Sequence, residues 1–409
     1  MSNSSKITTI LFLTALITYS SMVFISESIY RNPLFEKSLT IQKEWQNNQT
    51  DSLLSFFHVI TKFSTDVVYL PIILIVFLFM PINKAYTLLS SLAYSGYLSN
   101  ILKIIYASPR PFFVDPQLFK ECQGSYGNPS TQTLMATCFY ISLWHIITDY
   151  QIFTKNLIGH IFRYVIFIFF LNFILLTGLS RIFVGAHSIN EVLFGFLLGI
   201  AVYFALFFVI GFQNYPAKEF FSLFKEKIYI VIFSTFFFVI LLLSLLLSLL
   251  KKDDTSQYEK AINAKCPGMP EIKKFNYEGL YSMLKVFSII GAHYGVMLLV
   301  HLTDKQYHDK DEEINSWYKS PNFLNHLYRV LMVVVFLLPF ILYYTIPINQ
   351  AMGVVFIFKV SLPYFLTFFS IFGPYIYCIF EYNIGNLSLT HYDSDETEGL
   401  NAVELTRDA

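Results

Sequence analysis

Long apolar stretches alternate with short polar segments along most of the chain. A membrane-spanning helix needs roughly 20 mostly apolar residues, and by that rule the pattern predicts about ten spanning helices. They lie at residues 8–29, 66–82, 85–106, 132–150, 162–180, 187–212, 228–250, 283–303, 327–347 and 353–381. The sequence therefore predicts an all-α, polytopic membrane protein.

The first apolar stretch is expected to be a retained membrane helix. It ends in Ile25-Ser26-Glu27-Ser28, which is a poor signal-peptide cleavage site because an acidic residue stands in its middle. A polar loop is predicted at 30–65. A short amphipathic run within it, at 53–60, either lies along the membrane surface or extends the next helix.

Composition agrees with this pattern and excludes some functions. Hydrophobic residues make up 55% of the chain and charged residues 14%, well below the roughly 25% charge of soluble domains. Lys+Arg and Asp+Glu are both 28, so no basic excess suggests a nucleic-acid partner. None of the 4 cysteines forms a CxxC pair, which argues against a structural zinc site. Cys122 and Cys266 fall in loops predicted on one side, where they form either a disulfide or two separate thiols.

Three polar clusters interrupt the apolar pattern. The first, at 103–111, carries Lys103 and Arg110 at the end of a predicted span, where snorkelling to lipid headgroups is an equal alternative to a binding role. The second, at 126–133, contains Pro129-Ser130 before the next span. It is typical of a plain helix cap, although such a helix start also offers N–H groups to an anion.

The third cluster, at 180–191, contains Arg181, His187 and Glu191. Because His187 and Glu191 are four residues apart, they are expected to share one helix face. The carboxylate can then hold one nitrogen of the imidazole and leave the other available for chemistry. A histidine with a purely structural role is the alternative interpretation.

The predicted topology places all three clusters on the same side of the membrane. Lys103, Arg110 and Arg181 would then bring three cations to one site. Unpaired cations are costly there, and a bound phosphate would satisfy them. The sequence therefore predicts a phosphate-binding pocket.

Together the clusters resemble the signature of the type 2 phosphatidic acid phosphatase and haloperoxidase superfamily. That signature reads K-x6-R-P, then P-S-x-H, then S-R-x5-H-x3-D. It is matched at Lys103, Arg110 and Pro111, then at Pro129 and Ser130, and then at Ser180, Arg181 and His187. The resemblance covers roughly residues 50–212. The run Tyr-Gly-x-Pro-Ser-Thr looks most like that of the sphingosine-1-phosphate phosphatases.

The resemblance implies a mechanism and a domain plan. His187 would attack phosphorus and form a phosphohistidine, with Lys103, Arg110 and Arg181 on the phosphate oxygens and Ser130 as a further donor. No metal and no cofactor is implied. The plan is an N-terminal membrane helix and polar loop (1–50), a six-helix phosphatase-like core (51–212), C-terminal membrane helices (213–381) and a disordered acidic tail (382–409).

Two positions depart from the signature. The histidine of the second motif, the general acid of the family, is Gln132 here, and the aspartate of the third motif is Glu191. Glutamine cannot protonate a leaving group, and losing a general acid typically costs about 10²–10⁴-fold in rate. Glu191 can still orient His187.

Two functions therefore stay open. The first is a slow phosphatase of lipid phosphates, most like an enzyme of the endoplasmic reticulum membrane. The second is an inactive pseudophosphatase that binds inorganic phosphate or phospholipid within a membrane assembly. Membrane lipids are expected partners in both, and the C-terminal helices are a candidate surface for protein partners. A transporter is a third reading, which rests only on the number of spans.

Overall fold

The computed structural model describes residues 3–118, 120, 123–149, 156–215, 217–251, 255–256, 258–260, 278–304, a few positions of 327–337, and 361–381. These residues form helices and no strand, which confirms the all-α prediction for this part of the chain. The longer helices are α1 (Asn3–Asn47), α2 (Asp51–Lys62), α3 (Asp66–Phe79), α4 (Ile82–Tyr106), α6 (Thr131–Thr148), α8 (Leu157–Phe183), α9 (Ile189–Phe204), α11 (Lys227–Leu250) and α13 (Glu278–Asp304). The shorter ones are α5 (Pro111–Val114), η1 (Pro116–Leu118), η2 (Ala205–Ile210), η3 (Phe212–Asn214), α10 (Ala217–Leu223), α17 (Leu362–Ser370), η7 (Ile371–Tyr375) and α18 (Ile376–Glu381).

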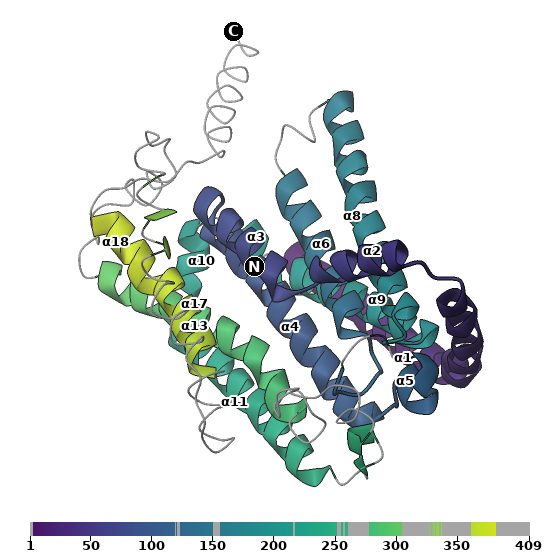
Figure 1. The fold of residues 1–409 in the computed structure, drawn as a ribbon. Coiled ribbons are helices and arrows are strands. Elements are labelled where there is room, and N and C mark those ends of the chain that lie inside the picture. Colours follow the sequence, from purple (N-terminus) through teal and green to yellow (C-terminus); the bar gives the residue numbers. More distant parts are fainter. Residues whose placement is uncertain are drawn as a thin grey trace.

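Helix α4 lies at the centre of the bundle. It packs against α6 and α9 on one side and against α13 and α11 on the other (Figure 1). Its serines are buried, and Ser90, Ser91 and Ser95 donate their hydroxyls to carbonyls of their own helix. A helix with this many polar positions is accommodated because protein, not lipid, surrounds it.

Four described helices are long and apolar enough to cross a membrane, or five if the bent pair of α2 and α3 is one span. The four are α1, α8, α9 continued through η2, and α11. Large apolar side chains such as Ile17, Val165 and Val231 are exposed on them, as expected for an integral membrane protein. Helices α4 and α6 occupy two predicted spans but do not meet this test, so the count of about ten spans stays a prediction.

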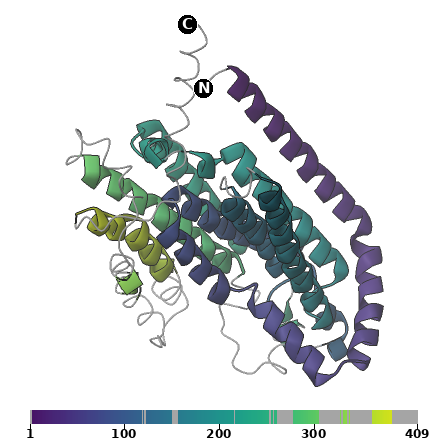
Figure 2. The same cartoon turned by 90° about the horizontal axis from the view of Figure 1, so that it is seen from above.

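Helix α1 corrects the prediction of a polar loop that begins at residue 30. The helix continues to Asn47 and has 45 residues, which corresponds to a length of about 68 Å at roughly 1.5 Å per residue. This exceeds the roughly 30 Å hydrocarbon core of a bilayer, so its C-terminal part extends beyond the membrane. Residues 34–46 are rich in Leu, Lys, Glu and Gln, which favour helix. Figure 2 shows α1 along one edge of the molecule.

The amphipathic run at 53–60 forms a helix of its own. Thr50 caps α2, because its hydroxyl accepts a hydrogen bond from the N–H of Leu53. A bend of 41° at residues 63–65 separates α2 from α3, so the run is no straight extension of the next helix. α2 packs on α8, with the rings of Phe57 and Phe183 4.4 Å apart.

Several predictions concern residues outside the described part of the chain. These are the pairing of Cys122 with Cys266, most of the ninth span, the start of the tenth span and the acidic tail.

Candidate functional site

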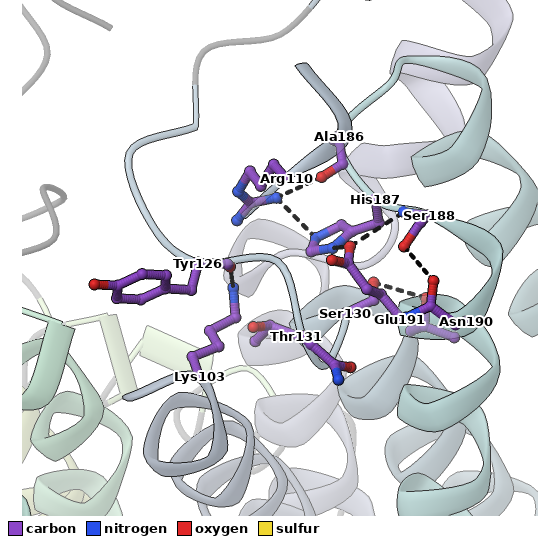
Figure 3. A network of polar contacts seen from close by, with 12 residues as sticks. Lys103, Arg110, Tyr126, Ser130, Thr131, Ala186, His187, Ser188, Asn190 and Glu191 are labelled. Atoms are coloured by element: carbon purple, nitrogen blue, oxygen red, sulfur yellow. Dashed lines mark hydrogen bonds and ion pairs between the residues drawn. The ribbon is translucent and has the colours of Figure 1, made fainter. Parts of the chain in front are cut away.

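His187 lies in the turn between α8 and α9, not on a helix as the sequence suggested. Ser188 is the N-cap of α9, and Glu191 is its third residue, so the two form a capping box. One oxygen of Glu191, Oε2, accepts the N–H of Ser188 at 3.1 Å and contacts Nδ1 of His187 at 2.9 Å (Figure 3). The contact between His187 and Glu191 therefore comes from helix capping and not from a shared helix face.

The two contacts of the imidazole indicate its protonation state. Nε2 of His187 lies 3.0 Å from Nη1 of Arg110. Because a guanidinium can only donate, Nε2 must accept, and the proton of a neutral ring then lies on Nδ1, toward Glu191. Burial, followed by the positive charges of Arg110, Lys103 and Arg181, holds the pKa of His187 well below its usual value. The ring is therefore neutral at neutral pH and has a lone pair on Nε2.

Arg110 and Lys103 meet on the loop that leads into α6. Arg110 donates from Nε to the carbonyl of Ser125 at 2.6 Å, from Nη2 to the Ser125 hydroxyl at 2.8 Å and from Nη1 to the carbonyl of Ala186 at 2.7 Å. Lys103, near the end of α4, donates to the carbonyl of Tyr126 at 2.6 Å. These contacts hold the ammonium of Lys103 and the guanidinium of Arg110 beside the same loop.

Arg181 completes the group of cations from the last turn of α8. It is fully buried, and its Nη1 lies 3.4 Å from the hydroxyl of Thr61 on α2. Its charge acts on His187 together with those of Lys103 and Arg110. The structure thus gathers Lys103, Arg110, Arg181, His187 and Glu191, which come from two separate segments of the chain, in one buried cluster.

Ser130 lies beside this cluster but is engaged elsewhere. Its N–H donates to the carbonyl of Glu191 at 3.0 Å, and its hydroxyl lies 3.0 Å from that of Thr133. Its role as a phosphate donor stays a prediction. Gln132 follows in the first turn of α6 and is half-buried. The bond between Ser130 and Glu191 holds this helix start against the segment that carries His187.

The C-terminal region also reaches the site. Lys251, the residue after α11, places its ammonium 3.4 Å from the ring centre of Tyr126. Tyr126 is the residue whose carbonyl accepts from Lys103. The ring of Tyr258 stacks on that of Phe113, 4.7 Å away. Residues beyond 212 therefore support the loops that follow α4.

Several contacts of the site were not foreseen from the sequence. Ser125 accepts from two cations, and Thr61 contacts Arg181, although neither lies in a recognisable motif. The side chains of Ser38 and Gln42 on α1 reach the turn of His187. The regular four-residue spacing of these polar residues within α1 was the available signal.

Gly127 shows why the second motif needs a glycine. A Cβ at this position would lie 2.0 Å from Oε1 of Glu191 and 2.7 Å from its Cδ. We expect Gly127→Ala to push the carboxylate off His187 and to lower the rate of phosphate release about 10²-fold, since displacements of about 1 Å have such effects. Steady-state kinetics on purified protein will measure this rate.

Gly178→Ala is the matched control for this substitution. Its added Cβ would meet a methyl of Val192 at 2.8 Å, away from the carboxylate. An unchanged rate in Gly127→Ala would show that the position of Glu191 does not matter for turnover.

Comparison with known proteins adds a family match for part of the chain. Residues 84–215 match the model of the PAP2 superfamily. The crystal structure of a transmembrane PAP2-type phosphatidylglycerolphosphate phosphatase from Bacillus subtilis is 20% identical, with a TM-score of 0.39. That match covers 47% of this chain and 93% of the other. A search of curated protein sequences gave no match.

Proposed function

We propose that this protein is an integral membrane phosphatase of lipid phosphates that works through a phosphohistidine at His187. One observation carries the proposal. A buried, neutral imidazole is held by Glu191 at Nδ1, and its Nε2 faces the guanidinium of Arg110 among three cations. A nucleophile, the group that orients it and the charges that attract its target thus occupy one place. The match of residues 84–215 to the PAP2 superfamily, a range that contains these residues, supports the same proposal.

Substrate binding follows from the charges of the cluster. The phosphate oxygens would bind Lys103, Arg110 and Arg181. Nη1 of Arg110 would then turn from Nε2 of His187 to a phosphate oxygen, which leaves the lone pair of Nε2 available for attack. These three cations then stabilise the negative charge of the transition state, because they are already placed in a buried site where electrostatic interactions are strong.

The reaction then has two steps. The lone pair on Nε2 of His187 attacks phosphorus, the ester P–O bond breaks, and the lipid leaves as an alkoxide that takes a proton. Glu191 stabilises the positive charge that develops on the ring. Water next attacks the phosphohistidine, the P–N bond breaks, and phosphate leaves with the ring neutral again.

Gln132 limits the first step. An amide cannot supply the proton that the alkoxide needs, so that proton must come from water, and turnover of alkyl phosphates is expected to be slow. Leaving groups that need no proton, such as those of phosphoanhydrides, depend less on this position. The likeness of the second motif to the sphingosine-1-phosphate phosphatases leads us to propose a sphingoid phosphate as substrate and the endoplasmic reticulum as the membrane.

Gln132 also favours a second candidate, a pseudophosphatase. Such a protein would keep the cations and bind phosphate or a phospholipid headgroup without turnover, as a subunit of a membrane assembly. The test between the two is phosphate release by purified wild-type protein from sphingoid and glycerolipid phosphates in detergent micelles. Release that vanadate inhibits supports the phosphatase, and phosphate binding without release supports the pseudophosphatase.

Both candidates require that Arg181 contributes to anion binding. We expect Arg181→Ala to weaken the binding of inorganic phosphate about 10- to 150-fold, because a hydrogen bond to a charged group contributes about 1.5–3 kcal/mol. Titration calorimetry on the purified protein will measure the dissociation constant.

The matched control is Arg163→Ala. Arg163 lies on the same helix, α8, where its guanidinium packs on the ring of Trp144 5.2 Å away. It is 18 residues from Arg181, which is about 27 Å along a helix. Phosphate binding that is undiminished in Arg181→Ala would refute the pocket itself.

A further inference from the structure

Helix α1 brings a stripe of polar side chains to the turn that carries His187. Ser38, Gln42 and Gln46 are spaced four residues apart and therefore share one face of the helix. Gln42 donates from Nε2 to the carbonyl of His187 at 2.7 Å, and the hydroxyl of Ser38 accepts the N–H of Ile189 at 2.8 Å. Nε2 of Gln46 lies 3.3 Å from the carbonyl of Phe183, where α8 ends.

The bonds of Ser38 and Gln42 fix the backbone on both sides of Ser188. They hold the carbonyl of His187 and the N–H of Ile189, which belong to the two successive peptide groups after the imidazole-bearing residue. Glu191 fixes the rotation of the ring through Nδ1. Different helices thus position the two parts of His187. Side chains of α1 bind the main chain of its turn, and Glu191 of α9 contacts the ring.

The same helix also reaches the second motif. Glu27 precedes Ser38 by eleven residues, about three helical turns, so it lies on the same face. Its Oε1 accepts from Nδ2 of Asn128 at 2.8 Å, directly before Pro129-Ser130. Arg31 also donates to Glu27, and its guanidinium lies 4.3 Å from the ring centre of Tyr106.

Burial of these side chains argues that their bonds matter. Glu27, Ser38 and Gln42 are each 0% exposed. Burying polar groups costs free energy unless they are hydrogen-bonded. If α1 only packed against α9, apolar side chains at these positions would be sufficient. All of these residues also lie outside the matched domain at 84–215. The third motif, which lies inside the matched range, is thus held in part by a helix that precedes that range.

We infer that Gln42 and Ser38 are positioning residues that hold Nε2 of His187 in line with the phosphorus of a bound phosphate. The inference rests on the proposed function, since it assumes that His187 is the nucleophile. Without the bond from Gln42 the turn can shift, and a displacement of about 1 Å at a reacting atom can lower a rate about 10²-fold. The three cations belong to other contacts and keep their places, so binding of tetrahedral phosphate is largely retained.

The experiment compares two anions in detergent-purified full-length protein. Inorganic phosphate stays tetrahedral and reports on the cations. Vanadate can accept a fifth ligand, so it binds more tightly where a nitrogen is placed for in-line attack. The variants are Gln42→Leu and Ser38→Ala. The control is Ser28→Ala on the same helix, where the exposed hydroxyl donates to the carbonyl of Ile25 within its own helix.

We expect Gln42→Leu and Ser38→Ala to weaken vanadate binding at least about tenfold and to change phosphate binding less than about twofold. In steady-state kinetics, kcat should fall about 10- to 100-fold in both variants, and KM should stay nearly constant. Ser28→Ala should match the wild type in every measurement.

Two results would overturn the inference alone, in a wild type that binds both anions. One is vanadate affinity unchanged in both variants. The other is an equal loss of phosphate and vanadate affinity, which would show that α1 merely supports the fold. A wild type that binds neither anion would instead overturn the proposed function, and the inference with it.

Discussion

Replacing His187 with alanine is expected to abolish phosphate release, with a loss in kcat on the order of 10⁴–10⁶-fold. The substitution removes the proposed nucleophile, which lies between Arg110 and Glu191 at 3.0 Å and 2.9 Å from their side chains. Lys103 and Arg110 keep their contacts with Ser125 and Tyr126, so the variant should still bind phosphate. The variant is therefore expected to bind phosphate but not to release it from a lipid phosphate.

The measurement has two parts. Phosphate release from a lipid phosphate gives the loss in rate, and phosphate transferred to protein and released by acid identifies the phosphohistidine. His145→Ala is the control, because His145 lies on α6 with its Nδ1 2.8 Å from the hydroxyl of Tyr203, away from the cluster. It is 13 residues beyond Gln132, about 20 Å along the helix. Turnover that survives in His187→Ala would contradict the proposed mechanism.

Replacing Gln132 with histidine is expected to accelerate the hydrolysis of alkyl phosphates by about 10²–10⁴-fold. Gln132 lies in the first turn of α6, two residues after Ser130, whose N–H bonds to the carbonyl of Glu191. A protonated imidazole on this turn would protonate the departing alkoxide. The variant should lose this gain as the pH rises through the pKa of the new imidazole, ordinarily about 6.5, because only its protonated form can donate.

Comparison of two leaving groups makes this test specific. Nitrophenyl phosphate releases a phenolate that needs no proton, so its hydrolysis should change little in Gln132→His. Gln132→Leu is the control for size, because leucine fills similar space without a titratable proton. A wild type that already hydrolyses alkyl phosphates rapidly would refute this account of Gln132. A gain in both substrates alike would show that the substitution improves binding and not proton transfer.

Much of the site could be predicted because its chemistry is local in sequence. Lys103 and Arg110 lie seven residues apart, and Arg181 lies six residues before His187. Charges of this kind at the ends of apolar helices are costly and therefore conspicuous. Counting the predicted spans then predicts that these residues lie on one side of the membrane. These steps use only residue type, spacing and the alternation of spans.

The details of the site could not be predicted in this way. The four-residue spacing of His187 and Glu191 suggested a shared helix face, yet the contact arises from a capping box in which Glu191 also holds Ser188. Both geometries satisfy the same spacing. The close approach of Gly127 to Glu191 depends on how a loop crosses a helix start 64 residues later in the chain, which no local pattern encodes.

The sequence by itself determined the all-α class, the membrane character and the set of charged residues, because apolar length and charge placement act on each segment separately. The tertiary structure decided that the central helix α4 hides its serines within protein, that the polar segment after residue 30 continues α1, and that Gln42 reaches His187 across 145 residues. These outcomes depend on which elements bury one another's polar groups. Which polar groups become buried against one another is decided only when the helices pack together.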